Sequence, residues 1–348
     1  MNRLTDRFTD WLHDRVPVDP EALRKPLREA LPIHLKQWVF CLGGTPAMLF
    51  AMLAVTGILL TFYYVPYPAQ AFASVTNITY KVRMGWFIRG IHQGASQLMI
   101  VTVLLHMIRV FFTRAYRKPR EFNWFFGVGL FMLTLTFAFT GYSLVYDQLS
   151  YWATTIGTNM IADLPLLGKP LLYALRGGPT VNPNTLTRFY DFHIGVLPMM
   201  MTLLIGLHII MVRLHSVAPL ENDPRTETYP FFPDHMLREV IIGLLLLIGL
   251  VNYVMFFPPV IGAIATPGDT PGHIRPEWYF FPTYRWLKMT SIGIGMAGSI
   301  CYVTGLFFWP FVDATLEKIA PKRNLWLYIG TACFLVTIVF LLWEAIVG

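Results

Sequence analysis

Four histidines lie in two apolar segments of the chain, and their spacing could hold metal-bound cofactors. His92 and His106 are 14 residues apart, and His193 and His208 are 15 residues apart. Fourteen residues of an α-helix turn through about 1400° and rise ~21 Å, so both rings face nearly the same way at two depths. Two such helices, side by side, would present His92 opposite His193 and His106 opposite His208.

Two facing imidazoles at each of two depths form the ligand set of two bis-histidine haems. A lone intramembrane histidine is often a hydrogen-bonded core residue or part of a proton relay. Four buried rings without such a purpose would cost desolvation free energy. We therefore expect two b-type haems, with His92 and His193 as iron ligands of the outer haem and His106 and His208 as ligands of the inner one.

Glycines recur at the same interval in two other apolar segments. The pairs are Gly43 with Gly57, and Gly127 with Gly141, each 14 residues apart. A macrocycle approaches a helix most closely where no Cβ intervenes. If these segments run antiparallel to the histidine segments, the first glycine of each pair lies level with His106 and the second with His92. Four helices would then offer notches at both haem depths.

Arginines near the expected haem levels could pair with the anionic propionates. They are Arg89 and Arg188 at the outer level, and Arg109 and Arg213 at the inner level. Long cationic side chains also extend from helix ends to the membrane surface without any cofactor. The position of these arginines beside the histidines favours propionate pairing.

The segments that carry these residues are long enough to cross a bilayer. The chain has 348 residues, of which 55% are hydrophobic and 14% are charged. A transmembrane helix needs roughly 20 apolar residues, and helices satisfy the backbone in hydrocarbon. We predict an all-α polytopic membrane protein with seven spans, at about 38–64, 86–112, 122–144, 190–214, 236–257, 291–312 and 325–346: a four-helix haem-binding bundle followed by three further transmembrane helices.

Charge and cysteine content limit the other possibilities. Most of the 27 Lys and Arg residues fall on the side of the N-terminus, which the positive-inside rule places in the cytoplasm. This bias accounts for the net charge of +7 without nucleic acid. Met1–Val16 has the pattern of an amphipathic helix lying on the membrane surface. The three cysteines are scattered through apolar spans and do not indicate a disulfide framework.

Several strings resemble cytochrome b6 of the cytochrome b6f and related bc complexes. They are FCLGG at 40–44, GWFIRGIH at 85–92, RKPRE at 117–121, TGYSL at 140–144 and TLTRFY at 185–190. The string HIRPEWYFFP at 273–282 holds the PEWY motif of subunit IV and of the C-terminal half of single-chain cytochrome b. The longer interval between His193 and His208 matches the b6 branch. The chain resembles a fused cytochrome b6 and subunit IV, with a cytoplasmic segment at 1–37, a b6-like diheme bundle at 38–215 and a subunit IV-like domain at 216–348.

The resemblance implies a quinol:cytochrome c (or plastocyanin-like) oxidoreductase in a bacterial cytoplasmic membrane. Quinol would be oxidised at the outer site, with one electron passing to a Rieske iron–sulfur protein and a cytochrome c-type subunit. The other electron would cross this chain to an inner quinone-reducing site, coupled to proton translocation in a Q cycle. The expected partners are these subunits, quinone and quinol, membrane lipid, and a second copy of the complex in a homodimer.

The resemblance also implies site residues. Glu277 would accept the quinol proton, with Tyr279 lining the pocket and Asp147 in the opposite wall, at 146–157. Relatives usually have Pro-Trp before this acid, whereas Val145 and Tyr146 stand here. In HMLREVIIG at 235–243, Arg238 and Glu239 would deliver protons to the inner quinone, although ordinary interfacial charges at a helix start would look the same.

Cys41 lies two residues before Gly43 at the inner level. A free cysteine in an apolar span is ordinarily a small hydrophobe, and no C-x-x-C-H motif for ordinary c-type attachment is present. In the b6 branch, however, the cysteine of FCLGG holds a third haem through one thioether. The resemblance therefore predicts a covalent third haem on Cys41.

Three other protein classes could explain part of the pattern. A diheme membrane anchor of a dehydrogenase or hydrogenase also places four histidines in a bundle, but it needs no PEWY loop and no FCLGG cysteine. A transporter with histidine proton relays would not explain the matched glycines. A structural scaffold would leave the buried imidazoles without a purpose.

Overall fold

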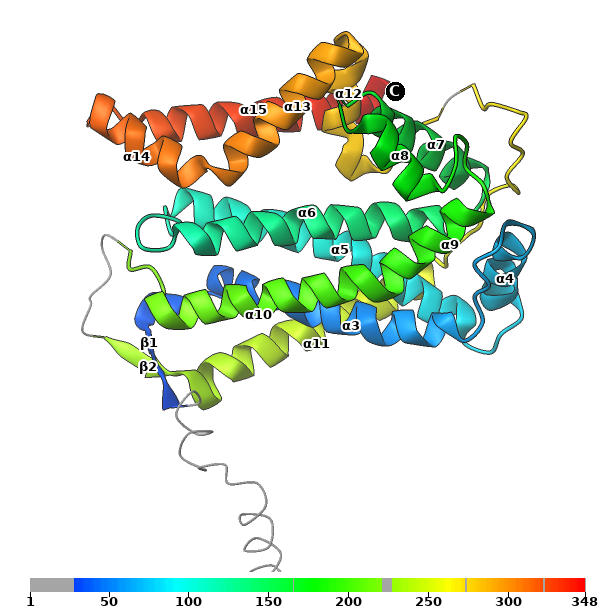
Figure 1. Cartoon of the computed structure of the whole chain (residues 1–348). Coiled ribbons are helices and arrows are strands. Elements are labelled where there is room, and N and C mark those ends of the chain that lie inside the picture. Colours follow the sequence, from blue (N-terminus) through cyan, green and yellow to red (C-terminus); the bar gives the residue numbers. More distant parts are fainter. Residues whose placement is uncertain (1–27, 165, 221–226, 273, 322, 348) are drawn as a thin grey trace, which may run out of the picture.

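The computed structural model describes residues 28–164, 166–220, 227–272, 274–321 and 323–347, and this part of the chain is mostly helical (Figure 1). Within it, six helical segments are long and apolar enough to cross a membrane, and one bent helix pair is a seventh candidate. The all-α, polytopic prediction is confirmed. The predicted surface helix at Met1–Val16 lies outside the described residues.

Four of these segments lie side by side as a bundle (Figure 1). In chain order they are η3 (Trp38–Gly43) with α3 (Gly44–Thr61), α5 (Gly85–Phe112), α6 (Glu121–Ser143), and α9 (Pro183–Asp191) with η4 (Phe192–Val196) and α10 (Leu197–His215). Buried Leu49, Met99 and Met201 meet in the core between them. These helices match the first four predicted spans to within a few residues, apart from an earlier start of the fourth.

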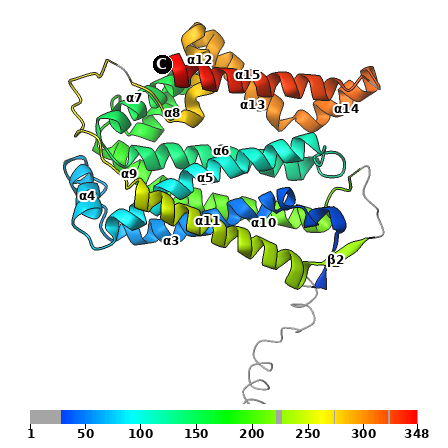
Figure 2. The ribbon, with the colours of Figure 1, turned by 180° about the vertical axis from the view of Figure 1, so that it is seen from behind.

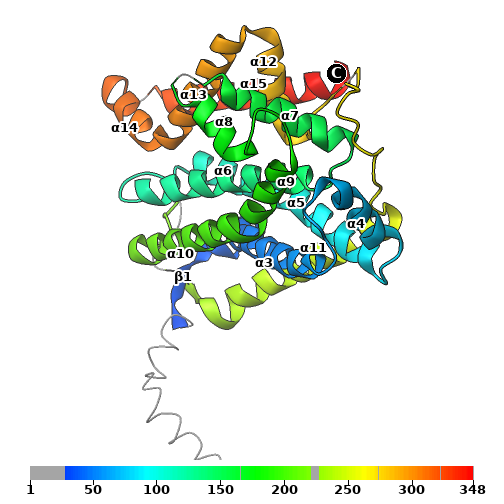
Figure 3. The same ribbon diagram turned by 45° about the vertical axis from the view of Figure 1, so that its right-hand side comes forward.

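Short elements cover the two ends of the bundle. The end expected to face outwards, called the outer end, carries α4 (Pro68–Tyr80), α7 (Gln148–Ala162) and α8 (Gly168–Arg176), which Figure 3 brings forward. The opposite end, called the inner end, carries η2 (Ile33–Lys36) and the antiparallel strands β1 (Ala30–Pro32) and β2 (Thr228–Pro230). Most of the residues expected to do chemistry lie towards one or other of these ends.

The rest of the chain packs on two sides of the bundle (Figure 2). The turn η5 (Phe231–His235) leads into α11 (Met236–Phe256), which lies against α3 and α5. The turn η6 (Trp278–Phe280) leads into α12 (Phe281–Met289), α13 (Ile292–Phe307), α14 (Trp309–Ile319) and α15 (Leu325–Val347), which form a layer beyond α6. The C-terminal part therefore flanks the bundle instead of extending it.

The predicted sixth span at 291–312 is not one straight helix. α13 ends at Phe307, and α14 leaves it at an angle of 78°. Pro310 lies in the first turn of α14. Proline has no N–H for the preceding turn and its ring clashes with a continuing helix, so the break falls directly before it.

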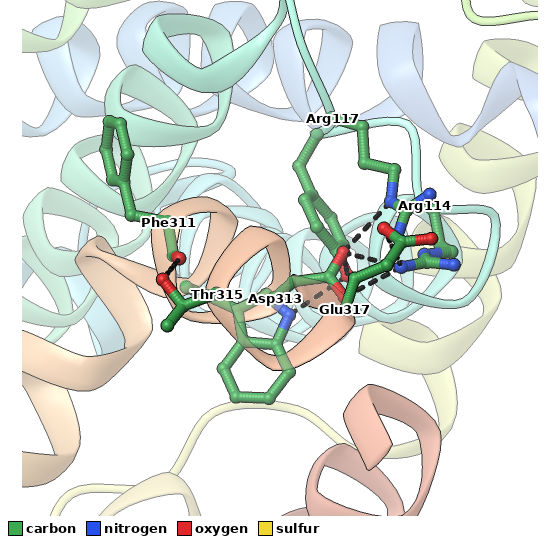
Figure 4. Close-up of polar contacts among 8 residues, drawn as sticks. Arg114, Arg117, Phe311, Asp313, Thr315 and Glu317 are labelled. Carbon is green, nitrogen blue, oxygen red and sulfur yellow. Dashed lines mark hydrogen bonds and ion pairs between the residues drawn. The ribbon is translucent and has the colours of Figure 1, made fainter. Parts of the chain in front are cut away.

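A buried ion cluster fastens α14 to the loop between α5 and α6 (Figure 4). Asp313 of α14 is 1% exposed and accepts hydrogen bonds from Arg114 Nη2 (2.7 Å) and Arg117 Nε (3.0 Å). The Tyr116 hydroxyl lies 3.2 Å from the same carboxylate. Glu317 pairs with both arginines but is 52% exposed. Asp313 is therefore the central anion of this contact.

We expect Asp313→Ala to destabilise the protein far more than Glu317→Ala. Removing one partner of a fully buried ion pair costs about 3–5 kcal/mol. Asp313 is buried but Arg114 and Arg117 are 21% and 36% exposed, so we expect a smaller cost than this that still exceeds that of an exposed pair. An exposed ion pair contributes about 0–1 kcal/mol. Thermal unfolding of the two purified variants in detergent measures the difference, and equal shifts in Tm would contradict the central role of Asp313.

Candidate functional site

The four predicted histidines meet as two pairs inside the bundle. The ring centroids of His92 and His193 are 6.4 Å apart at the outer level, and those of His106 and His208 are 6.3 Å apart at the inner level. Two imidazoles that bind one metal ion from opposite sides, at about 2 Å each, place their centroids roughly 6 Å apart. Each pair therefore has the separation that a bis-histidine haem iron requires.

The remaining ligands at each level would have to come from the cofactor. Among the described residues, no group of three or more His, Cys, Asp or Glu side chains is arranged to hold a metal ion. A macrocycle supplies four nitrogens and needs only two axial ligands from the protein. The two imidazoles of each pair fit the role of these two protein ligands.

A π-helical turn absorbs the extra residue between His193 and His208. The Leu197 N–H bonds to Phe192 O, five residues earlier. Pro198 follows in the first turn of α10 and has no N–H to continue the regular ladder. Because a π-turn inserts one residue into a helix, the longer interval here aligns two rings much as the shorter interval does in α5.

Hydrogen bonds at Nδ1 fix the tautomers of the two outer histidines. Thr56 Oγ1 lies 2.9 Å from His92 Nδ1, and Thr140 Oγ1 lies 3.0 Å from His193 Nδ1. Each hydroxyl also donates to a backbone carbonyl one turn earlier, at 2.8 Å and 2.9 Å. A hydroxyl has only one hydrogen, so it must accept from Nδ1–H of the imidazole. Nε2 of both rings is left with a free lone pair, which is the form that binds iron.

The inner histidines differ from each other. His208 Nδ1 lies 3.1 Å from Asn123 O, and a carbonyl only accepts, so Nε2 of His208 is again the free nitrogen. His106 Nδ1 instead lies 3.2 Å from Arg109 Nη2. A guanidinium only donates, so this contact requires a lone pair on Nδ1 and places the hydrogen on Nε2. His106 can offer Nε2 to iron only when Arg109 releases Nδ1.

Each predicted glycine faces the histidine expected at its level. A Cβ built on Gly43 would lie 3.6 Å from His106 Cε1, and one on Gly127 would lie 3.4 Å from His208 Cε1. The outer contacts are closer: 3.2 Å from Gly57 to His92 and 2.7 Å from Gly141 to His193. The glycines thus lie against the edges of the imidazoles at both levels, and close approach of a macrocycle at these glycines stays a prediction.

The other predicted arginines have protein partners. Arg89 donates to Thr79 Oγ1 and Val260 O, both at 3.2 Å. Arg188 donates to two backbone carbonyls of α8, including Tyr173 O at 2.9 Å. Arg213 pairs with Glu29. Of the four arginines expected at the haem levels, Arg109 is the one in contact with a predicted haem ligand.

The inner end brings Cys41 close to the predicted proton donors. Cys41 is fully buried in η3, and the Glu239 carboxylate packs against adjacent Gly44. Arg238 turns away from Glu239, with Nη1 2.6 Å from Lys36 O and its guanidinium over the Trp38 ring. Glu239 therefore lies against the start of α3, whereas Arg238 contacts Lys36 and Trp38.

Glu277 lies in a turn at the outer end, directly before η6. Burial raises the pKa of its carboxyl; the Gln97 side chain lowers it, and nearby Asp147 raises it further. Tyr279 is also largely buried beside Glu277. A carboxyl with a raised pKa in a partly dry site is a candidate proton acceptor.

Asp147 lies close to Glu277 but is occupied by backbone contacts. Its Oδ1 accepts from Ser150 N at 2.9 Å, which caps α7, and its Oδ2 accepts from Gly262 N at 3.2 Å. These are the contacts of a helix cap that ties α7 to the segment before Glu277. Tyr146, directly before this cap, has a positive φ of 56°.

The turn that carries Glu277 is anchored on both sides. Trp278 Nε1 donates to Gln97 Oε1 of α5 at 2.6 Å. On the other side, Glu344 of α15 is fully buried, with its Oε1 3.1 Å from Lys288 Nζ and its Oε2 3.5 Å from Arg285 Nη1. Arg275 Nη2 donates to the Glu344 carbonyl at 3.2 Å. One residue of α15 thus holds segments before and after Glu277.

Sequence reasoning missed the residues that orient the histidines. Thr56 precedes Gly57 and Thr140 precedes Gly141, so the same Thr-Gly dipeptide occurs at both outer glycines. That repeat is a usable signal. The Asn123 carbonyl and Gln97 have no comparable pattern in the sequence.

Two family models match the chain. The model described as "Cytochrome b/b6/petB" matches residues 28–216, and "Cytochrome b(C-terminal)/b6/petD" matches residues 264–347. The chain belongs to the cytochrome b family. Membership implies b-type haems, and the long apolar helices agree with an integral membrane protein.

Relatives place this cytochrome b in a bc-type complex. Cytochrome b6 of Heliomicrobium gestii is 42% identical over 208 residues, which cover 60% of this chain and 98% of the relative. A "Cytochrome bc complex cytochrome b subunit" of Chlorobaculum thiosulfatiphilum is 34% identical over 327 residues, covering 91% of this chain and 76% of the relative. A solved chain of a "Hyperthermophilic respiratory Complex III" is 25% identical with a TM-score of 0.76, covering 96% of this chain and 97% of that one. The chain is thus a cytochrome b subunit of a bc-type complex, consistent with electron transfer.

We expect Gly141→Ala to weaken haem binding at the outer histidine pair. The new methyl would lie 2.7 Å from His193 Cε1, and overpacking of this kind costs about 1–3 kcal/mol. Gly206→Ala on α10 is the matched control, because a Cβ there has no neighbouring atom within 4 Å. The haem-to-protein ratio and the reduced-minus-oxidised spectrum measure the effect. Equal haem content in the two variants would mean that Gly141 is not needed for the fit.

Proposed function

We propose that the chain is the cytochrome b subunit of a proton-translocating quinol:cytochrome c (or plastocyanin-like) oxidoreductase. It would oxidise quinol at the outer end and reduce quinone at the inner end, as in a Q cycle. The observation that carries this proposal is that two histidine pairs face each other at two depths of one bundle. Glu277 lies at the outer end of this bundle and Glu239 at the inner end.

The histidine pairs would hold two b haems. His92 and His193 would ligate the outer iron, and His106 and His208 the inner iron, each through Nε2. The bound haems supply one-electron redox centres along the bundle. Thr56 and Thr140 keep the outer imidazoles in the tautomer that binds metal.

The arginines at both levels would serve the haem propionates. Arg109 would have the most direct role. Its hydrogen bond to His106 Nδ1 keeps the ring hydrogen on Nε2 and so opposes iron binding by Nε2. An anionic propionate would draw the guanidinium away, and the ring hydrogen could then move from Nε2 to Nδ1, which would free Nε2 for iron. Arg89, Arg188 and Arg213 would have to exchange their present partners for the same purpose.

At the outer end, Glu277 would accept a proton from quinol. Its buried carboxyl lies beside Tyr279, which would line the pocket, while Asp147 holds the facing wall in place as a helix cap. At the inner end, Glu239 would pass protons to quinone, and Arg238 would orient the start of α11 through its contact with Lys36 O.

Cys41 would hold a third haem through a thioether bond. Its burial beside Gly43 and Gly44, next to the inner histidines, supports this role. The expected partners are a Rieske iron–sulfur protein, a cytochrome c-type subunit, quinone, membrane lipid and a second copy of the complex. We place the protein in a bacterial cytoplasmic membrane with the N-terminus inside, following the charge bias of the loops.

We expect covalent haem to remain with the chain on a denaturing gel. A haem-stained band near the sequence mass of 39.8 kDa should be present in the wild type and absent in Cys41→Ser. Cys301→Ser is the matched control, because Cys301 is exposed on α13. If the band does not stain while b haem can still be extracted from the native protein, the proposal of a third, covalent haem is wrong. Absence of extractable haem would overturn the electron-transfer proposal.

We expect quinol oxidation to fall as the pH drops through the pKa of Glu277. Only the ionised carboxylate accepts a proton, and burial raises its pKa, so the acid limb of kcat should lie above the pH at which an exposed glutamate titrates. Glu277→Gln should abolish this limb and lower kcat roughly 10²-fold. Steady-state quinol oxidation by the assembled complex across pH measures both. A wild-type profile in Glu277→Gln would exclude the proposed role.

A further inference from the structure

A histidine that the proposed reaction does not yet use lies at the inner end of the structure. His235 is the last residue of η5, and Glu239 of α11 follows it one helical turn later. His235 Nε2 is 3.5 Å from Glu239 Oε1. The other ring nitrogen, Nδ1, is 2.7 Å from the Tyr229 hydroxyl of β2. The imidazole therefore links a buried tyrosine to the carboxyl group that is proposed to serve the inner quinone.

The two-stranded sheet holds this tyrosine in place. In the register of β1 and β2, Tyr229 pairs with Leu31. Tyr229 is 5% exposed and lies in one apolar cluster with Leu31 and Leu35. Lys36 Nζ lies 5.4 Å from the centre of the Tyr229 ring. The hydroxyl therefore reaches His235 from a fixed position, because the N-terminal strand fastens the residue that carries it.

The partners of the His235 ring decide where its hydrogens lie. An ionised carboxylate only accepts, so Nε2 carries a hydrogen when it faces Glu239. A hydroxyl both donates and accepts. The Tyr229 hydroxyl therefore donates to Nδ1 of the neutral imidazole and accepts from Nδ1–H of the imidazolium. His235 keeps both partners in either charge state, which suits a group that gains and loses protons in turn.

The two carboxylate oxygens of Glu239 face different surroundings. Oε1 lies towards His235, whereas Oε2 packs against Gly44 at the start of α3. Oε2 is buried and has no hydrogen-bond partner among the described residues. A buried polar atom without a partner costs free energy, so its place needs a functional reason. Gly43, next to Gly44, faces His106, so this oxygen lies near the level of the inner histidine pair.

Other charged and titratable groups surround His235 and its partners. Arg238 of α11 is a cation and disfavours the imidazolium, but its Nη1 is 2.6 Å from Lys36 O and its guanidinium lies over the Trp38 ring. Glu239 is the anion that favours the imidazolium. Within the described residues the remaining groups are Asp234 of η5, Lys36 of η2, Cys41 of η3, and Arg213 of α10, whose guanidinium lies over the Phe231 ring beside His235.

We propose that His235 supplies the protons that Glu239 passes to the inner quinone, with the Tyr229 hydroxyl as the positioning contact that keeps the ring aimed at the carboxylate. The inference rests on the proposed role of Glu239. Residues four apart share one face of a helix, so a small side-chain rotation brings His235 and Glu239 to hydrogen-bond distance.

Each proton moves in two steps. First, the Nε2–H bond of the His235 imidazolium breaks and an O–H bond forms on Glu239. Second, Glu239 loses a proton to the reduced quinone, on which a new O–H bond forms. The neutral imidazole takes its next proton from the inner aqueous phase, because its side chain is 12% exposed. Tyr229 stays hydrogen-bonded to Nδ1 and exchanges no proton with the quinone.

Oxidation of the reduced b haems by added quinone tests this proposal. The rate is measured by stopped flow on the assembled complex, with haem content as the check that the bundle is intact and a pH-indicator dye to record proton uptake. Glu239→Gln should lower the rate roughly 10²-fold. His235→Ala should lower it about 10-fold, because water still protonates Glu239 directly but slowly. It should also remove the fall in rate that the wild type shows where the imidazolium loses its proton.

Added imidazole separates proton donation from a structural role. Imidazole fills the space left in His235→Ala and carries a proton, so it should restore the rate. Pyrrole has a similar shape but no basic nitrogen, so it should not. Tyr229→Phe removes one hydrogen bond to Nδ1 and should slow the reaction about 2–10-fold. Tyr253→Phe on α11 is the matched control and should keep the wild-type rate, because Tyr253 is 51% exposed.

The outcomes separate this inference from the proposed function. If Glu239→Gln slows the reaction while His235→Ala and Tyr229→Phe do not, His235 supplies no protons and the proposed function stands. Equal rescue by imidazole and pyrrole would also overturn the inference, because the ring would then only fill space. If Glu239→Gln leaves the rate unchanged, the proposed role of Glu239 falls and this inference falls with it. A slow His235→Ala that imidazole alone restores supports both. If His235→Ala fails to assemble, Tyr229→Phe carries the test.

Discussion

Four imidazole rings lie inside a bundle of apolar helices, and a ring that is to bind a metal ion there must keep one nitrogen unprotonated and correctly aimed. Water does not orient a ring there, so the protein has to supply a partner for the other nitrogen. Thr56 of α3 does so for His92 on α5, and Thr140 of α6 does so for His193 on η4. The adjacent Gly57 and Gly141 let the same rings approach closely. At the outer level, a two-residue Thr-Gly unit thus sets both the tautomer of the ring and how closely the ring approaches the neighbouring helix.

The sequence predicted much of this arrangement because helical periodicity is rigid over four turns. The partners of His92 and His106, and the glycine at each level, could be placed from the interval that three of the segments share. The longer interval before His208 could not be explained, because a π-turn depends on how the backbone adapts near Pro198. The break before Pro310 was missed because an apolar run of sufficient length looks like a straight span.

Side-chain roles were less predictable than positions. Asp147 was expected in the wall opposite Glu277, and the sequence did not indicate that its two oxygens would accept from Ser150 N and from Gly262 N far along the chain. Nor did the sequence indicate that the Arg109 guanidinium would contact His106 Nδ1. Such contacts depend on which loops fold over an end of the bundle, and one sequence carries no local signal for them.

The anchoring of the Glu277 turn has a consequence for the order of synthesis. Glu344, which binds Lys288 and Arg285 and accepts from Arg275, is made long after Glu277, near the end of the chain. The histidine pairs, in contrast, are complete once α10 has been made. A nascent chain can therefore assemble its electron-carrying core well before α15 emerges. The turn that carries Glu277 can meet Gln97 and α6 earlier, but the segments on both sides of it gain their contacts with Glu344 only when α15 has been made.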